Sequence, residues 1–291
     1  MCRLLLYIGQ PVVLSKLLVE PANSLINQSV HCTSADTPVN GDGFGVAWYA
    51  PDVTPEPGLF RSLLPAWSNI NLHRLASVTR SGAILAHVRA ASPGLASAEA
   101  NCHPFTFREL AFAHNGDLGG FRRIRRAIEH TLGDQAFHLI GGNTDSEHLF
   151  AMLVDRVLDG KKAAGVTGTA AITLPQLAGA MRGMIADTVR IAAEEGIKEH
   201  SYINAAVTNG SIGVACRYST DLPEHTPTLH TCRGMRYVYE AGIARMEQSP
   251  ETRGSVAVAS EPLGEKHIWT EVPHNHIVLI DGEGGLAVEA V

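Results

Sequence analysis

Short apolar runs that end at glycine or proline recur along the chain and predict a protein rich in strands. Residues 3–8 form the first run, which stops at Gly9, and residues 82–88 and 110–114 form two more. Apolar runs of this length are typical of buried strands. Further strand patterns follow in the last third of the chain, at residues 205–208, 212–218, 236–239, 255–260, 277–280 and 286–291.

Helical periodicity dominates the middle of the chain. Leu118, Phe121, Ile124, Ile128 and Leu132 keep helical spacing and predict an amphipathic helix, whose arginines lie on a solvated face. Further helices are predicted for residues 149–158 and 174–195, and two short ones for residues 15–30 with a break at Pro21. Strands, then helices, then strands again favour an α+β fold in which two sheets pack together with helices outside.

Glycine, proline and polar clusters predict the turns and loops between these elements. The glycines in residues 40–45 predict a tight turn that leads into a strand ending near Tyr49. Residues 51–58 are rich in proline and are predicted to form a surface loop. Residues 219–234 are predicted to form a polar loop.

Composition narrows the class of protein. The formal net charge is -6 and only 18% of residues are charged, so neither nucleic acid nor an anionic membrane is an expected partner. The apolar run after Met1 is too short for a signal sequence or a membrane span, and five cysteines without a repeating spacing favour reduced thiols. We therefore expect a cytoplasmic protein that forms one domain over residues 2–291, with Met1 removed.

Cys2 is the first candidate catalytic residue. Removal of Met1 would leave a thiol and a free α-amino group on one residue. Their reference pKa values of about 8.5 and about 7.7–8.0 allow the neutral amine to take the thiol proton near neutral pH. Taken alone, Cys2 is better explained as a residue that happens to follow the start codon.

Arg89 and Asp145 each have two interpretations. Arg89 follows a predicted buried strand, so it is either a surface residue just past the strand or a fork for a carboxylate. Asp145 lies in a segment where Thr144 and Glu147 have the spacing of a capping box. The interpretation that the residues alone favour is that it only helps to start the next helix, and the other is that it has a functional role.

Six segments together resemble one known family, the class II glutamine amidotransferases, which are N-terminal-nucleophile hydrolases. They occur in the family's order and approximate spacing: Cys2, residues 41–49, 87–92, 103–105, 114–117 and 143–147. The resemblance implies a four-layer αββα sandwich. Residues 260–263, Trp269 and residues 272–273 resemble the stand-alone branch, which includes the ergothioneine-pathway γ-glutamyl hydrolase and the glutathione-degrading amidotransferase-like subunit.

The resemblance also implies a role for each matching residue. Cys2 is the expected nucleophile, and Asn115 with the backbone N–H of Gly116 is the expected oxyanion hole. Arg89 is expected to bind the α-carboxylate of the substrate, and Asp145 its α-ammonium group. Further residues are expected to shape the substrate site, namely Ser92, His87 and His114. No metal and no cofactor are expected, and His31, Cys32 and His103 receive no role.

The expected activity is hydrolysis of a γ-glutamyl amide, either glutamine or a γ-glutamyl conjugate, through a thioester on Cys2 that releases glutamate. One alternative is a glutaminase subunit that supplies ammonia to a separate synthase. A second is a metal-binding protein that uses the clusters of His and Cys, although no Cys-x-x-Cys or His-Glu-x-x-His spacing occurs. A third is an inactive partner of the same fold. The expected partner is a small γ-glutamyl substrate, and a homo-oligomer or a partner subunit is compatible with the sequence.

Overall fold

Two antiparallel sheets form the middle of the molecule in the computed structural model, which describes residues 2–30, 40–90, 98–163, 172–240, 243–248 and 254–291. Among these residues, the first sheet has the strand order β13-β9-β12-β1-β4-β2-β3. Its strands are β1 (Arg3–Val13), β2 (Phe44–Ala50), β3 (Thr54–Ser62), β4 (Arg80–Val88), β9 (His230–Arg233), β12 (Val256–Ala259) and β13 (Thr270–Glu271).

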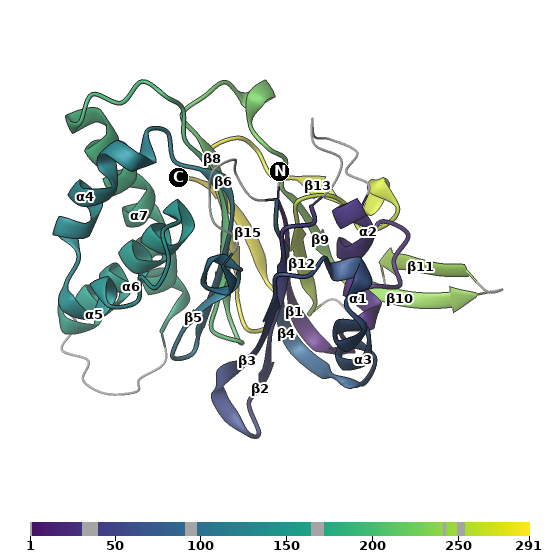
Figure 1. Cartoon of the computed structure of the whole chain (residues 1–291). Coiled ribbons are helices and arrows are strands. Elements are labelled where there is room, and N and C mark those ends of the chain that lie inside the picture. Colours follow the sequence, from purple (N-terminus) through teal and green to yellow (C-terminus); the bar gives the residue numbers. More distant parts are fainter. Residues whose placement is uncertain (1, 31–39, 91–97, 164–171, 241–242, 249–253) are drawn as a thin grey trace.

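The second sheet has the strand order β15-β14-β8-β7-β6-β5. Its strands are β5 (Phe105–Phe107), β6 (Leu110–Asp117), β7 (Tyr202–Thr208), β8 (Gly213–Ser219), β14 (His276–Ile280) and β15 (Leu286–Ala290). Two further strands, β10 (Met235–Glu240) and β11 (Ile243–Gln248), pair only with each other in a ribbon that extends from the body of the molecule (Figure 1).

Helices cover the outer face of each sheet (Figure 1). On the first sheet they are α1 (Ser15–Leu18), α2 (Leu25–Val30) and α3 (Ile70–Val78). On the second sheet they are α4 (Phe121–Thr131), α5 (Asp134–Phe137), α6 (Asp145–Ala163) and α7 (Leu174–Glu194). Short 3₁₀ helices occupy Ala66–Ser68, Glu99–Asn101, Pro223–His225 and Lys266–Ile268. The layers therefore run helix, sheet, sheet, helix.

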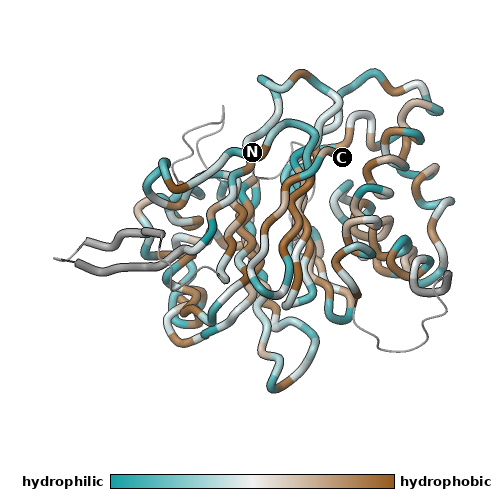
Figure 2. Tube along the Cα trace, turned by 180° about the vertical axis from the view of Figure 1, so that it is seen from behind, coloured by the Kyte–Doolittle hydropathy of each residue, from teal (hydrophilic) through white to brown (hydrophobic). Residues whose placement is uncertain are grey.

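Alternation along the strands explains how these layers pack. In β1, Leu4 and Leu6 lie in the core between the two sheets, whereas Leu5 and Tyr7 pack against the helices of the first sheet. Successive side chains of a strand point to opposite faces, so a fully apolar strand contributes to two cores. Figure 2 shows the resulting concentration of hydrophobic residues along the central strands.

The core between the two sheets, called here the inter-sheet core, is built largely from small side chains. Its alanines come from both sheets, namely Ala47, Ala83, Ala111, Ala113, Ala206 and Ala215. Ala257 and Ala259 are not among them, because they pack on the helix side of the first sheet. At one end of the sandwich, the Tyr49 hydroxyl lies within hydrogen-bond distance of the carbonyl oxygens of Glu109 and Thr208, at 2.8 and 2.9 Å. The two sheets are thus linked by polar as well as apolar contacts.

The predicted loop at residues 51–58 is wrong, because most of it belongs to β3. Pro55 and Pro57 are compatible with this strand because β3 is at the edge of the first sheet, where a missing N–H need not break the ladder. The predicted polar loop at residues 219–234 likewise contains β9. Helix α3 was not predicted, although the Asn69 side chain caps its first turn by accepting from the Leu72 N–H.

Most of the other predicted elements are confirmed. Helix α7 begins after Thr173, which forms the predicted capping box with Gln176. The arginines of α4 are largely exposed, while Ile124 and Ile128 are buried. Within the part of the chain that the structure describes, no helix is both long and apolar enough to cross a membrane.

Candidate functional site

Cys2 lies immediately before β1, at the end of the inter-sheet core. It shares the strand face of Leu4, so its side chain is directed toward the second sheet. The Ala90 N–H donates to Cys2 Sγ at 3.2 Å. Burial raises the pKa of the Cys2 thiol, although the Ala90 N–H and the charges of Arg89 and Arg3 act in the opposite direction. The thiol therefore requires a base to become the nucleophilic thiolate.

Arg89 follows β4 and is held next to Cys2 by backbone hydrogen bonds. Its N–H donates to the Gly43 carbonyl at 2.8 Å, and its own carbonyl accepts from the Asp42 N–H at 3.0 Å. The side chain is 4% exposed, and its bond within the described residues is a long one, 3.4 Å from Nη1 to the Asp42 carbonyl. No carboxylate of the described residues pairs with this buried guanidinium, which is an expensive arrangement without an anionic ligand.

His87 connects the strand that carries Arg89 to the second sheet. Its Nε2–H donates to the carbonyl oxygen of His114 at 3.1 Å, across the space between β4 and β6. Burial lowers the pKa of His87 to about 3, so the ring remains a neutral donor over the pH range in which most enzymes work. This bond fixes the backbone that directly precedes Asn115.

Asn115 and Gly116 lie near the end of β6, on the other side of the inter-sheet core from Cys2. Asn115 shares the strand face of Ala111 and Ala113, so its side chain is directed toward the first sheet. The residue is 1% exposed, and its Oδ1 has no partner among the described residues. Gly116 has a φ of +152°, and a Cβ there would lie 1.9 Å from the Tyr202 carbonyl oxygen, so only glycine fits.

His114 lies on the opposite face of β6. Its Nδ1 is 2.9 Å from Ser146 Oγ, and its Nε2 donates to the Tyr202 carbonyl at 3.1 Å. Both ring nitrogens are thus occupied by the protein, on the side of the sheet that faces α6. A substrate contact for His114 stays a prediction, and this geometry favours a structural role instead.

Asp145 is the first residue of α6 and is connected to the end of β6. Its carboxylate accepts from the Leu118 N–H at 2.9 Å and from the Ser146 N–H at 2.8 Å. The predicted capping box is confirmed, since Glu147 accepts from the Thr144 N–H and donates its own N–H to Thr144 Oγ1, both at 3.3 Å. Asp145 is half-buried, so its carboxylate both starts the helix and remains accessible to a ligand.

The sequence prediction missed the Ala90 N–H, because a backbone donor leaves no side-chain signal. Ser92, His31 and Cys32 lie outside the described residues. The remaining predicted groups are linked through three hydrogen bonds. The Ala90 N–H binds Cys2 Sγ, and His87, three residues before Ala90, binds the His114 carbonyl on β6. Asn115 and Gly116 follow His114 in the chain, and the Leu118 N–H two residues later binds Asp145.

Comparison with known proteins identifies the family. The model of the family described as glutamine amidotransferases class-II matches residues 15–204. A Saccharomyces cerevisiae protein named probable glutamine amidotransferase DUG3 is 40% identical over 298 residues, which cover 96% of this chain and 82% of that protein. This chain belongs to the class II glutamine amidotransferases.

Other members of the family extend the comparison. The γ-glutamyl-hercynylcysteine sulfoxide hydrolase of Mycolicibacterium smegmatis is 24% identical over 280 residues, which cover 96% of this chain and 95% of that enzyme. A glutamine aminotransferase class-II domain protein from Silicibacter pomeroyi has a TM-score of 0.64 and 29% identity, with 99% of each chain covered. The Bacillus subtilis glutamine phosphoribosylpyrophosphate amidotransferase shares the fold, with a TM-score of 0.57 at 14% identity over 49% of its chain.

These findings confirm the family, the αββα fold of N-terminal-nucleophile type and the amidohydrolase class that the sequence predicted. The metal-binding alternative gains no support, because the described residues contain no group of three His, Cys, Asp or Glu side chains arranged around one point. The His103 ring instead packs against the His87 ring in a tilted arrangement, with ring centroids 4.2 Å apart.

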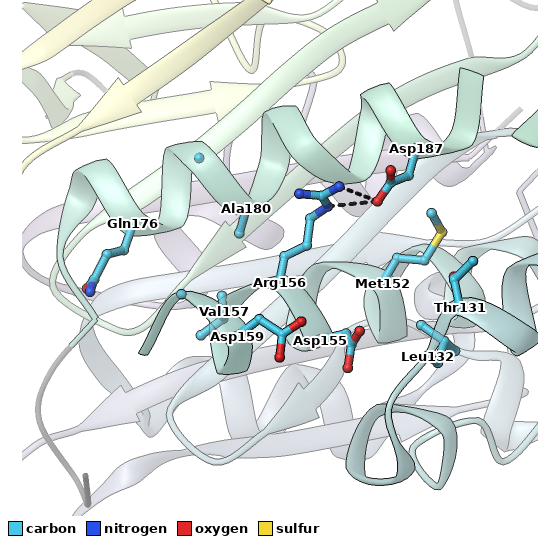
Figure 3. Close-up of a pocket in the computed structure, with 12 residues that line it drawn as sticks. Thr131, Leu132, Met152, Asp155, Arg156, Val157, Asp159, Gln176, Ala180 and Asp187 are labelled. Atoms are coloured by element: carbon cyan, nitrogen blue, oxygen red, sulfur yellow. Dashed lines mark hydrogen bonds and ion pairs between the residues drawn. The ribbon is translucent and has the colours of Figure 1, made fainter. Parts of the chain in front are cut away.

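A separate hollow of about 590 Å³ lies in the outer helical layer (Figure 3). It is lined by residues of α6 and α7 and by the end of α4, and Arg156 is paired there with Asp187. None of the predicted site residues lines this hollow. The catalytic prediction therefore concerns the inter-sheet site alone.

Proposed function

We propose that this protein hydrolyses the amide bond of a γ-glutamyl conjugate, with Cys2 as nucleophile after removal of Met1. The observation that carries the proposal is the buried guanidinium of Arg89, which lacks a carboxylate partner among the described residues and lies one residue from the Ala90 N–H that binds Cys2 Sγ. A substrate with a free carboxylate would complete this ion pair and be held beside the thiol.

The neighbouring groups fit the remaining parts of a γ-glutamyl substrate. The accessible carboxylate of Asp145 would accept from the α-ammonium group. The Asn115 amide and the Gly116 N–H would donate to the oxygen that becomes negative in the tetrahedral intermediate. Asn115 faces the first sheet, which is the direction from which a carbonyl attached to Cys2 would approach.

The reaction would proceed in two steps on Cys2. The neutral α-amine takes the thiol proton, Sγ attacks the amide carbon, and the resulting α-ammonium group gives that proton to the departing amine. A γ-glutamyl thioester then reacts with water, which loses a proton to the same amine, and glutamate leaves. Each step uses the one base that the mature N-terminus supplies.

A conjugate is favoured over glutamine as the preferred substrate. One relative is named for hydrolysis of a γ-glutamyl-hercynylcysteine sulfoxide and matches 96% of this chain. Binding energy from a larger leaving group can position the scissile bond, so a smaller substrate loses kcat as well as affinity.

Glutamate release by the purified protein tests the proposal. Glutamine, glutathione and a γ-glutamyl amine conjugate are compared, each with and without cell extract. We expect rapid turnover of one conjugate without extract, an intact mass that begins at Cys2, and no turnover by Cys2→Ala. Cys232→Ala is the matched control, because this buried thiol lies in the core on the helix side of the first sheet and should not affect turnover.

Two outcomes would contradict the proposal. An active protein that retains Met1 would exclude the α-amine as base. Activity that depends on extract, with ammonia transferred to an acceptor, would show a glutaminase subunit that works with a synthase.

A further inference from the structure

Arg3 directly follows the nucleophile and is almost completely buried. Its side chain is 3% exposed, and the Glu261 side chain that it contacts is 5% exposed. Arg3 Nε and Nη2 reach the same carboxylate oxygen, Glu261 Oε1, at 2.7 and 2.6 Å. The remaining arm, Nη1, donates to the backbone carbonyl of Cys2 at 3.0 Å. One guanidinium thus joins the nucleophilic residue to a carboxylate that is 258 positions from Arg3 in the sequence.

The segment that carries Glu261 is itself attached to the start of β1. Ser260 follows β12, which pairs with β1, and its N–H donates to the Leu4 carbonyl at 3.1 Å. In return, the Leu4 N–H donates to Ser260 Oγ at 3.0 Å. Asn23 Nδ2 donates to the Pro262 carbonyl at 2.8 Å on the far side of Glu261. The carboxylate is therefore presented to Arg3 by a fixed backbone.

We propose that Arg3 and Glu261 are positioning residues that set the orientation of the catalytic N-terminus. This inference rests on the proposed function, in which the α-amine and the thiol of Cys2 must approach each other. The bond from Ala90 restrains the position of Sγ, and the bond from Arg3 restrains the carbonyl of the same residue. With both restraints in place, the α-amine has little rotational freedom left relative to Sγ.

Stability alone does not account for this ion pair. A buried pair of charges is often no more stabilising than two apolar side chains of similar volume, because desolvation offsets the attraction. Positioning accounts for the third arm of Arg3, which contacts Cys2 instead of Glu261. A misplacement of about 1 Å at a reacting group can cost about a hundredfold in rate.

The pair also determines the charge that the α-amine experiences. Among the charged side chains that act on Cys2 are Arg89 and Arg3, and Arg3 forms an ion pair with Glu261. Cys102, a titratable group that interacts with Cys2, is kept neutral because burial raises its pKa. Loss of Glu261 alone should lower the pKa of the α-amine, because it removes a negative charge that acts against the positive charge of Arg3. Loss of Arg3 alone should raise it.

Three variants test the inference. In Arg3→Met/Glu261→Met no unpaired charge is buried, so the protein should fold, but the donor to the Cys2 carbonyl is gone. We expect kcat to fall by about tenfold to a hundredfold with KM unchanged. The acid limb of the kcat/KM profile should move to lower pH in Glu261→Gln and to higher pH in Arg3→Gln. Thermal unfolding verifies the fold of each variant.

The matched control is Arg156→Met/Asp187→Met, which removes an ion pair between α6 and α7 in the outer helical layer. It should leave kcat unchanged. Wild-type kcat in the Arg3/Glu261 double variant would overturn the inference, as would limbs that fail to move in opposite directions. If Arg3→Gln does not fold, the double variant and Glu261→Gln still decide. A wild-type protein that neither releases glutamate nor reacts at Cys2 with a glutamine-like electrophile would instead refute the proposed function.

Discussion

Substitution of Asn115 should separate catalysis from stability. In Asn115→Ala the donor to the developing oxyanion is lost, which lowers kcat by about 10² to 10³, equivalent to about 2.7–4 kcal/mol, with KM nearly unchanged. The same change removes a buried Oδ1 that has no partner among the described residues, whose desolvation costs about 1–3 kcal/mol in the wild type. The void left by the amide costs about as much. The free energy of unfolding should therefore stay within about 1 kcal/mol of wild type.

Asn204 provides the matched control, because it lies directly opposite Asn115 on β7 and is equally buried. Its Oδ1 also lacks a partner among the described residues, but its Nδ2 donates to the carbonyls of Pro227 and Thr228, at 3.0 and 3.1 Å. Asn204→Ala should therefore be less stable than Asn115→Ala by about 1–3 kcal/mol, the contribution of two hydrogen bonds. Its kcat should stay much closer to that of wild type.

Steady-state kinetics and urea unfolding of the two variants test this reasoning. Two results would refute it. If Asn115→Ala raises KM and leaves kcat unchanged, Asn115 binds the ground state of the substrate. If the two variants unfold at the same urea concentration, the two hydrogen bonds of Asn204 do not give it the greater contribution to stability that is expected here.

Two further predictions concern Arg89 and the buried His87. Arg89→Lys should raise KM for γ-glutamyl substrates and have little effect on analogues without the α-carboxylate; an equal loss for both would exclude the fork. Because burial lowers the pKa of His87 to about 3, the unfolded chain binds an extra proton between about pH 6.5 and that value, and stability falls as the pH decreases through this range by up to about 1.4 kcal/mol per unit. His87→Gln should flatten this decline in acid-unfolding experiments; an unchanged slope would show that His87 is protonated when folded.

The sequence patterns placed most of the predicted site residues relative to the regular elements. Cys2 directly precedes β1, Arg89 directly follows β4 and Asp145 begins α6, whereas Asn115 lies inside β6 near its end. Strand alternation could also have shown that His114 faces away from Asn115, because the two are adjacent on β6.

Other features required the folded chain. The contact between Arg3 and Glu261 joins the two ends of the sequence, and no local periodicity encodes it. The edge position of β3, which makes its prolines acceptable, depends on the order of strands in the sheet. Long-range pairing is thus the part of the structure that a single sequence leaves open.

The alanines between the sheets act as a spacer for the reaction. The thiol is carried by one sheet and the proposed oxyanion donors by the other, so the thickness of the layer between them would set the gap in which a carbonyl must fit. Ala111 and Ala113 lead along β6 directly to Asn115, and a bulkier residue at either position would wedge the two halves apart. In this enzyme, side chains that touch no substrate would set the distance between the thiol and the proposed oxyanion donors.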